Sequence, residues 1–236
     1  MGRILVALPM AREFALLAEA LSRHSAPHEY EAGRLKTLYF PKLDLHLFRA
    51  GQGKAEYALT TGHVLDRLGG VELFICAGSA GAISEEVPAG SLVVSTETVE
   101  HDFKSSHPRA VVPVFPGSEK WIGILMGRLA KDAFPSPVFF GKIASGDEDI
   151  TSEVRKNALR ELTGCLCVAW EGAGGARSAY LMETPYLEIR AVTDFADAGA
   201  RRDFFKNLED GMKKIAALIL LLLENEVRDP APQKNP

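Results

Sequence analysis

Three carboxylates stand where the chain could use them for acid and base chemistry. Glu13, Glu171 and Asp194 each come just after a near-continuous apolar run of the kind that forms a buried strand. If these runs are parallel strands of one sheet, their carboxyl ends share an edge, and ligands bind at that edge in open α/β sheets. Carboxylates grouped in one cleft are what catalysis at a glycosidic bond requires. We therefore take the three as candidate functional residues.

Each of these residues alone also has an ordinary structural role. Glu13 falls in a first helical turn, where a negative charge suits the helix dipole. Glu171 and Asp194 could cap helices or lie solvated at strand ends. The segment Gly78-Ser79-Ala80-Gly81 could be no more than a tight turn, and His101-Asp102 an ordinary surface pair. It is the joint placement of three carboxylates at one sheet edge that favours a functional interpretation.

The elements that would position these residues alternate between strands and helices. We predict strands over 3–8, 37–40, 43–50, 71–77, 91–99, 138–144, 165–169 and 186–192, and helices over 11–24, 54–68, 118–134, 151–162, 171–182 and 204–224. The helix over 171–182 is rich in small residues and should pack very closely. Residues 101–116 contain three prolines and little periodicity, which predicts a long loop. The alternation predicts an α/β fold with a largely parallel sheet and helices on both faces.

The composition is that of an ordinary globular protein and excludes several classes. Hydrophobic residues make up 47% of the 236 residues, which is enough for a sizeable core. The net charge of -4 gives no electrostatic footprint for nucleic acid or an anionic membrane. The longest apolar run, 215–223, is too short to span a membrane, and no signal peptide is visible, so we expect a cytoplasmic protein. No linker divides the chain, which predicts one domain over 1–226 and a disordered tail over 227–236.

The cysteines indicate neither a disulfide framework nor a metal site. Cys76, Cys165 and Cys167 all lie in apolar runs, where free cysteine is a usual core residue. Their count is odd and low, and no further ligands follow at the spacing of a metal site. We therefore expect free, buried thiols and neither a metal nor a cofactor.

Three motifs, taken together and in order, resemble the nucleoside phosphorylase family and, within it, the methylthioadenosine/S-adenosylhomocysteine nucleosidases. They are Ala77–Ala82, Ile143–Asp147 and Ile189–Asp197, and the resemblance runs from about Arg3 to Leu223. It implies a single α/β domain whose central mixed, mostly parallel sheet partly closes into a barrel flanked by helices. It also implies hydrolysis of the N-glycosidic bond of a purine nucleoside. A homodimer or higher homo-oligomer follows as well, because in these nucleosidases the loop corresponding to 101–116 helps to wall the partner's site.

The resemblance assigns roles residue by residue. Asp194 matches the aspartate that protonates the leaving purine, and Glu13 matches the glutamate that activates water. Glu171 matches the glutamate that holds the ribose hydroxyls, and Arg190 matches an arginine that orients the site. The remaining substrate-binding positions are the loop residues Ser79 and Gly81, together with Asp149, Ile150 and Trp170.

Two departures fall on recognition of the substrate rather than on catalysis. Trp170 stands where the family usually has a methionine, and Asp149 stands where it usually has an aromatic residue that stacks on adenine. An ionised carboxylate only accepts hydrogen bonds, so Asp149 could favour bases that present ring N–H or amino donors. Alternatively, Asp149 could point to solvent or cap the helix that begins near Thr151. Futalosine-type nucleosides are therefore an alternative substrate within the same reaction.

The nucleophile could be water or phosphate. A phosphorylase would be expected to carry arginine just ahead of the Gly-Ser loop, and a Gly-Asp-Pro turn after the first strand. Here those places hold Ile75-Cys76-Ala77 and Leu8-Pro9-Met10, and Arg12 is the only nearby cation. Water is therefore the favoured nucleophile. A phosphate-dependent phosphorylase and a non-catalytic nucleoside-binding protein remain the alternatives.

Overall fold

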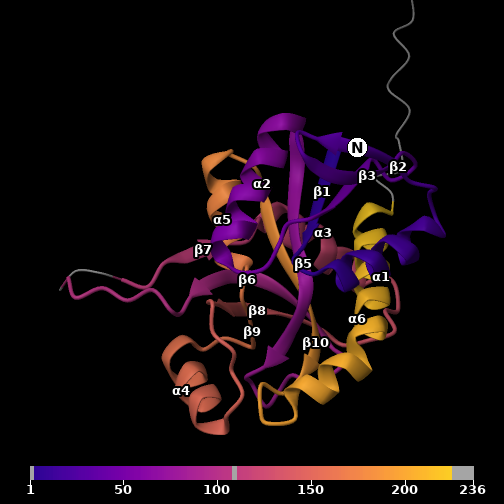
Figure 1. Cartoon of the computed structure of the whole chain (residues 1–236). Helices are drawn as coiled ribbons and strands as arrows, with labels where there is room; N and C mark the ends of the chain where they lie inside the picture. Colours follow the sequence, from indigo (N-terminus) through magenta and orange to yellow (C-terminus); the bar gives the residue numbers. More distant parts are fainter. Residues whose placement is uncertain (1–2, 108–110, 225–236) are drawn as a thin grey trace, which may run out of the picture.

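A computed structural model describes residues 3–107 and 111–224 and shows one mixed sheet with helices packed against it (Figure 1). The strands are β1 Arg3–Leu8, β2 His28–Ala32, β3 Leu35–Phe40, β4 Leu45–Arg49, β5 Val71–Ala82, β6 Leu92–Glu100, β7 Val114–Pro116, β8 Val138–Ser145, β9 Cys167–Ala169 and β10 Tyr186–Asp194. The helices are α1 Ala11–Ser22, α2 Lys54–Leu68, α3 Glu119–Leu129, α4 Glu153–Thr163, α5 Gly172–Leu181 and α6 Ala200–Leu223.

The sheet is partly closed into a barrel. Its order is β10-β6-β8-β9-β5-β1-β4-β3-β2, and β10 also pairs with β5, so that five strands form a closed ring. Parallel pairs join β1 to β4 and β5, β5 to β10, and β8 to β6 and β9. The remaining pairs are antiparallel, which confirms the expected mixed sheet and barrel.

Helices cover both sides of the sheet, as expected from the alternating pattern. Figure 1 shows α1 and α6 on one side and α2 and α5 on the other. A β-carbon on Gly174 of α5 would lie 2.4 Å from the carbonyl oxygen of Lys54, so only glycine allows the two helices to approach this closely. The close packing predicted for the small-residue helix is thereby confirmed. It fixes the start of α2 against α5.

Two central strands bring the predicted site residues together. Strand β10 is buried along its whole length and lies parallel to β5, with Arg190 opposite Gly78 and Asp194 opposite Gly81. The segment Gly78–Gly81 is therefore extended strand, and its interpretation as a tight turn is wrong. Pairing with β10 and β9 holds it straight where the glycines alone suggest a bend.

Other differences from the sequence-based prediction lie at exposed positions. Strand β2 was not predicted because its residues are mostly charged or polar and exposed, and its pairing with β3 defines it. Strand β7 lies inside the predicted loop and pairs with β6. Helix α6 begins four residues earlier than predicted, at Ala200 instead of 204. The predicted tail over 227–236 lies outside the described residues.

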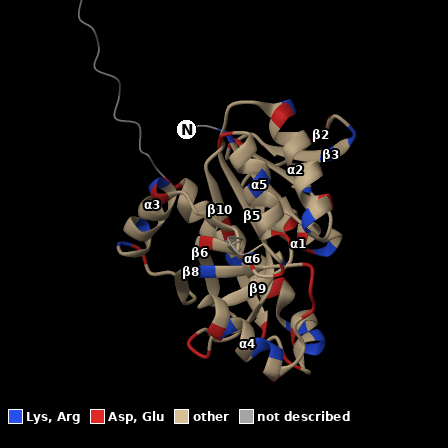
Figure 2. Cartoon of the chain, turned by 90° about the vertical axis from the view of Figure 1, so that its left-hand side faces the viewer, with Lys and Arg blue, Asp and Glu red and all other residues tan. Residues whose placement is uncertain are grey.

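Charged side chains are spread over the surface of the molecule (Figure 2). Figure 2 shows acidic and basic residues interspersed along the helices of the visible face. Among residues 3–107 and 111–224, no helix is both long and apolar enough to cross a membrane.

Candidate active site

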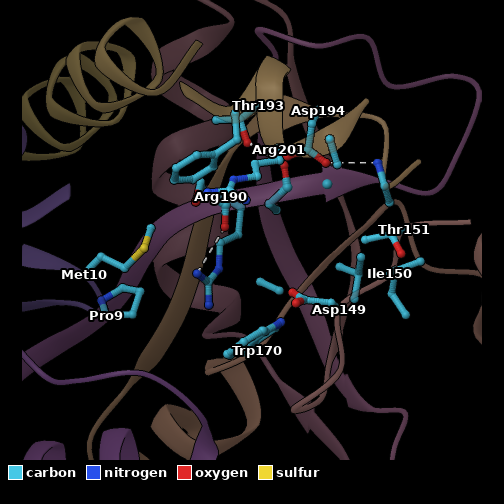
Figure 3. A pocket seen from close by; sticks show the side chains of 18 of the residues that line it. Pro9, Met10, Asp149, Ile150, Thr151, Trp170, Arg190, Thr193, Asp194 and Arg201 are labelled. Atoms are coloured by element: carbon cyan, nitrogen blue, oxygen red, sulfur yellow. Dashed lines mark hydrogen bonds between the residues drawn. The ribbon is translucent and has the colours of Figure 1, made fainter. Parts of the chain in front are cut away.

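A pocket of about 470 Å³ opens at the carboxyl ends of β1, β5 and β10. All nine predicted site residues line it: Glu13, Ser79, Gly81, Asp149, Ile150, Trp170, Glu171, Arg190 and Asp194. Figure 3 shows Pro9 and Met10 on one side of the pocket, Ile150, Thr151 and Asp194 on the other, and Arg190 between them. The pocket therefore has two ends that different segments build.

Glu13 is held rigidly at the first end. It lies in the first turn of α1 and is completely buried. Its Oε1 accepts hydrogen bonds from the backbone N–H of Ser79 at 2.8 Å and from the Ser79 hydroxyl at 2.7 Å, and its Oε2 accepts from the Met10 N–H at 3.3 Å. Burial raises the pKa of Glu13 despite these hydrogen bonds. A buried carboxylate with an elevated pKa is suited to take a proton from water.

Arg190 is the buried cation on which this end of the pocket is built. Its side chain is 1% exposed, and its Nη1 lies 3.5 Å from Oε2 of Glu171 and 3.4 Å from the carbonyl oxygen of Ser79. A β-carbon on Gly78 would lie 2.8 Å from this Nη1, so the glycine leaves room for the guanidinium. Burial raises the pKa of Glu171 to about 7 although Arg190 opposes the shift.

The position of Glu171 depends on contacts from two other elements. The Ser145 hydroxyl donates to the carbonyl oxygen of Trp170 at 2.7 Å and accepts from the N–H of Ala173 at 2.8 Å. From the other side, the N–H of Gly53 donates to Oε1 of Glu171 at 3.4 Å. The turn between β9 and α5 is thus fixed before any ligand binds, so the carboxylate is already in place.

Asp194 stands at the second end and is aimed by an irregularity in the strand. The register between β10 and β5 shifts between Val192 and Asp194, and such bulges re-aim side chains next to active sites. Its two carboxylate oxygens accept from the Thr193 hydroxyl at 2.8 Å and from the Ala196 N–H at 3.0 Å. A β-carbon on Gly81 would lie 2.8 Å from its Oδ1, so Gly81 provides space rather than a polar contact. Burial raises the pKa of Asp194, which favours its protonated form.

The loop between β8 and α4 forms the wall beside Asp194. Ile150 is buried, whereas Asp149 is exposed and lies on the same wall as Trp170 in Figure 3. The cap of α4 is Ser152, whose hydroxyl accepts from the Arg155 N–H. The alternative in which Asp149 caps this helix is therefore wrong.

Two groups of charged residues near the pocket were not identified from the sequence. Glu188 is fully buried and lies 2.8 Å from Nε of Arg190; two charged residues two positions apart in an apolar strand were its only signal. Lys54 binds Glu100 at 2.9 Å and Asp102 at 2.5 Å, and Asp102 accepts from the backbone of the β8–α4 loop.

His101-Asp102 is therefore not an ordinary surface pair. The His101 side chain is buried, and Asp102 joins α2 to the loop beside the second end of the pocket, where Asp194 lies. Burial lowers the pKa of His101, which favours the neutral ring. Arg12 also differs from expectation, because it does not line the pocket and its guanidinium stacks over the Phe205 ring at 5.7 Å.

Within the described ranges, no cluster of three or more His, Cys, Asp or Glu side chains could hold a metal ion. All three cysteines are free and buried. Burial raises the pKa of Cys76 to about 12, so this thiol is neutral at physiological pH. The polar groups that the described residues present to the pocket include its carboxylates, its hydroxyl groups, Gln52, Arg190 and Arg201.

Comparison with known proteins places this arrangement in a family. A family model described as the phosphorylase superfamily matches residues 3–224. An aminodeoxyfutalosine nucleosidase of Campylobacter jejuni is 27% identical over 233 residues, covering 95% of this chain and 99% of its own. A 5'-methylthioadenosine/S-adenosylhomocysteine nucleosidase of Mycobacterium tuberculosis is 26% identical over 212 residues, with 77% and 83% covered.

Solved structures agree in fold. The 5'-methylthioadenosine/S-adenosylhomocysteine nucleosidase of Helicobacter pylori with butyl-thio-DADMe-Immucillin-A superposes with a TM-score of 0.85 at 22% identity, covering 95% of this chain and 98% of that one. The native futalosine hydrolase of the same species has a TM-score of 0.84 at 22% identity, with 94% and 97% covered.

The elevated pKa of Glu171 predicts a stability that falls as pH rises. Between pH 4.5 and about 7 the unfolded chain releases this proton while the folded protein keeps it, so rising pH favours unfolding. Over that window the cost for this group is on the order of 3 kcal/mol. Urea denaturation at several pH values should show that the free energy of unfolding declines as pH rises, and that this decline is shallower in Glu171→Gln. The exposed control Glu161→Gln should decline as the wild type does. Equal slopes in all three proteins would contradict the assignment.

Proposed function

This chain belongs to the phosphorylase superfamily, and we propose that it is an enzyme that hydrolyses the N-glycosidic bond of a purine nucleoside, releasing free base and sugar. The observation that carries the proposal is the arrangement of three buried carboxylates around one pocket, with Asp194 at one end and Glu13 and Glu171 at the other. The names of the relatives support it, because they are nucleosidases with different nucleoside substrates.

In this proposal Asp194 protonates the leaving base. Cleavage of the bond leaves a purine anion, which departs poorly unless a general acid supplies a proton, and such an acid typically contributes about 10²–10⁴-fold. Burial raises the pKa of Asp194 and therefore keeps a proton available. The hydrogen bonds from Thr193 and Ala196 fix the carboxyl in one orientation, so the proton is delivered to one atom of the base.

Glu13 and Glu171 act on the sugar side. The sugar acquires positive charge as the bond breaks, and nearby carboxylates stabilise that charge. Glu13 would accept the proton of the attacking water, while the Ser79 hydroxyl and N–H keep its carboxylate in place. Glu171, held against Arg190 and Gly53, would accept hydrogen bonds from the ribose hydroxyls.

Water is a better nucleophile here than phosphate. A phosphate ion would have to approach the ends of Glu13 and Glu171, and like charges oppose that approach. Arg190 is already committed to two carboxylates. The other arginine of the pocket wall, Arg201, lies in the first turn of α6 and is exposed, whereas Glu13 is buried.

We further propose that the protein works in the cytoplasm as a homodimer. Free, unoxidised cysteines suit a reducing compartment. Large apolar side chains are exposed on neighbouring elements: Leu59 of α2 at 76%, Tyr180 of α5 at 84% and Val114 of β7 at 45%. Such a patch is costly to leave in water. The neighbouring Phe115 is not among these exposed side chains, because its ring packs under Arg177.

Light scattering at micromolar concentration should give the mass of a dimer. The mass of a monomer would contradict the proposed homodimer.

The test of the activity is release of free base from a panel of adenine, hypoxanthine and guanine nucleosides, with and without 5'-substituents. We expect release in phosphate-free buffer and no acceleration on adding phosphate. Release that depends on phosphate and yields a sugar phosphate would identify a phosphorylase instead.

Asp194→Asn should lower turnover by about 10²-fold or more while leaving the fold intact. The control Asp210→Asn, at an exposed position of α6, should stay within a few-fold of wild type.

Asp149 bears on which base is released. Its two acidic neighbours have partners, since Asp147 accepts from the Lys54 N–H at 2.9 Å and Glu148 binds Arg155 through both oxygens at 2.7 Å. Asp149 therefore remains as the acceptor that this loop presents to the pocket. We propose that it accepts a hydrogen bond from a ring N–H of a 6-oxopurine, a group that adenine lacks.

This assignment predicts a difference between substrates. Asp149→Ala should lower kcat/KM for a 6-oxopurine nucleoside by about 1–3 kcal/mol, because the ring N–H loses its charged partner. The value for an adenine nucleoside serves as the internal control and should hardly change. An equal loss for both bases, or a wild-type enzyme confined to adenine nucleosides, would remove Asp149 from base recognition.

A further inference from the structure

A second buried carboxylate contacts Arg190 from beneath the pocket. Glu188 lies in the middle of β10, is completely buried and does not line the pocket. Its Oε1 accepts from Nε of Arg190 at 2.8 Å, and its Oε2 accepts from the Thr98 hydroxyl at 2.6 Å. The Tyr186 hydroxyl lies 3.3 Å from the same Oε2. This carboxylate therefore has partners on both oxygens.

The same carboxylate touches the turn that carries Glu171. A β-carbon on Gly172 would lie 2.3 Å from Oε2 of Glu188, closer than real β-carbons approach such atoms. The Tyr186 hydroxyl also donates to the carbonyl oxygen of Gly172 at 3.0 Å. Only glycine at 172 leaves space for the buried carboxylate. Glu188 thus contacts both the arginine and the backbone next to Glu171.

The distances show how the arginine's single charge is shared. Arg190 lies 2.8 Å from Glu188 through Nε but 3.5 Å from Glu171 through Nη1. The shorter contact takes the larger share of a charge that cannot fully compensate two carboxylates. Glu171 is left with the weaker interaction, and burial then dominates and raises its pKa to about 7.

We propose that Glu188 is a positioning residue of the active site. It fixes the Arg190 guanidinium at Nε, directs Nη1 toward Glu171 and the Ser79 carbonyl oxygen, and limits the charge that Arg190 offers to Glu171. Glu188 thereby sets the pH at which Glu171 becomes an ionised acceptor for the ribose hydroxyls. That last consequence rests on the proposed function, whereas the electrostatic coupling of the three residues does not.

Few other groups in this cluster change charge in the relevant pH range. The ionisable residues whose pKa responds to Glu171 or Glu188, or that act on Glu171, are Arg190 and Tyr186 of β10, Glu13 of α1, Tyr57 of α2, Cys76 of β5, and Cys165 and Cys167 at β9. Burial raises the pKa of the phenols and thiols, so they stay neutral. Burial also raises the pKa of Glu13, and Glu13 is present in all four proteins of the test below, so its own contribution cancels when proteins with and without Glu171 are compared.

The first experiment measures the coupling without using activity. The free energy of unfolding is measured from pH 4 to 8 in four proteins: wild type, Glu171→Gln, Glu188→Gln and the double variant. Two differences are taken: wild type minus Glu171→Gln, and Glu188→Gln minus the double variant. Each gives the contribution of Glu171 to the pH dependence of the free energy of unfolding, with and without the Glu188 carboxylate. Removing the negative charge at 188 should move the Glu171 window to lower pH by about one unit, because Arg190 then acts on Glu171 undivided. An unchanged window would overturn the proposal.

Two further variants separate charge from packing. Glu188→Leu removes the same charge without leaving an unpaired polar group at 188. It should shift the Glu171 window as Glu188→Gln does, and it takes the place of Glu188→Gln in the comparison if that variant folds poorly. Tyr186→Phe is the matched control, because it removes a hydrogen-bond partner of Glu188 but no charge. It should lower stability and leave the window in place. A shift as large in Tyr186→Phe would make Glu188 a packing residue only.

The second experiment uses base release. The acidic limb of kcat/KM against pH should move to lower pH in Glu188→Gln and stay fixed in Tyr186→Phe, because the limb reports ionisation of groups in the free enzyme. A shifted stability window with no base release from any nucleoside would retain the positioning role and reject the proposed activity. Base release with an unshifted window and limb would retain the activity and reject the positioning role.

Discussion

Arg190 places a positive charge inside the barrel, where an isolated guanidinium would cost several kcal/mol. Glu188 beneath it and Glu171 beside it compensate that charge, and the carbonyl oxygen of Ser79 accepts from Nη1, the nitrogen that also faces Glu171. Because these partners come from three different segments, the arginine joins β5, β10 and the start of α5. The end of the pocket that holds Glu171 depends on this one interaction.

Space is the second requirement, and three glycines provide it. Gly78 leaves room for the Arg190 guanidinium, Gly81 for the Asp194 carboxylate and Gly172 for the Glu188 carboxylate. At each position a methyl group would come within 3 Å of a charged group. The motif that reads as a glycine-rich turn is thus a strand whose missing side chains let buried charges approach the backbone.

Part of this site could be predicted from the sequence because local patterns mark strand ends. Glu13 follows β1 and Asp194 ends β10, and these strands run parallel to β5 and so bring both residues to one edge. Glu171 follows β9, which runs antiparallel to β5 and reaches the same pocket from the opposite direction, and the apolar pattern alone does not indicate this. Glu188 could not be predicted in the same way. Its role depends on a partner two residues away, on Thr98 in another strand and on the glycine after Glu171. Strand β2 was missed because its exposed charged residues gain their pairing only from β3.

The two ends of the pocket come from different segments that share anchors. Ser79 of β5 holds Glu13 and Arg190 of β10 holds Glu171, whereas the wall beside Asp194 is a loop fastened by Lys54 and Arg155. Ser145, at the end of β8, and Gly53, next to Lys54, also position Glu171. A substitution at an exposed position of that loop, such as Asp149, would leave the contacts of Arg190 with Glu171 and Glu188 in place. The residues that this wall presents to the pocket are thus different from those that hold its buried charges.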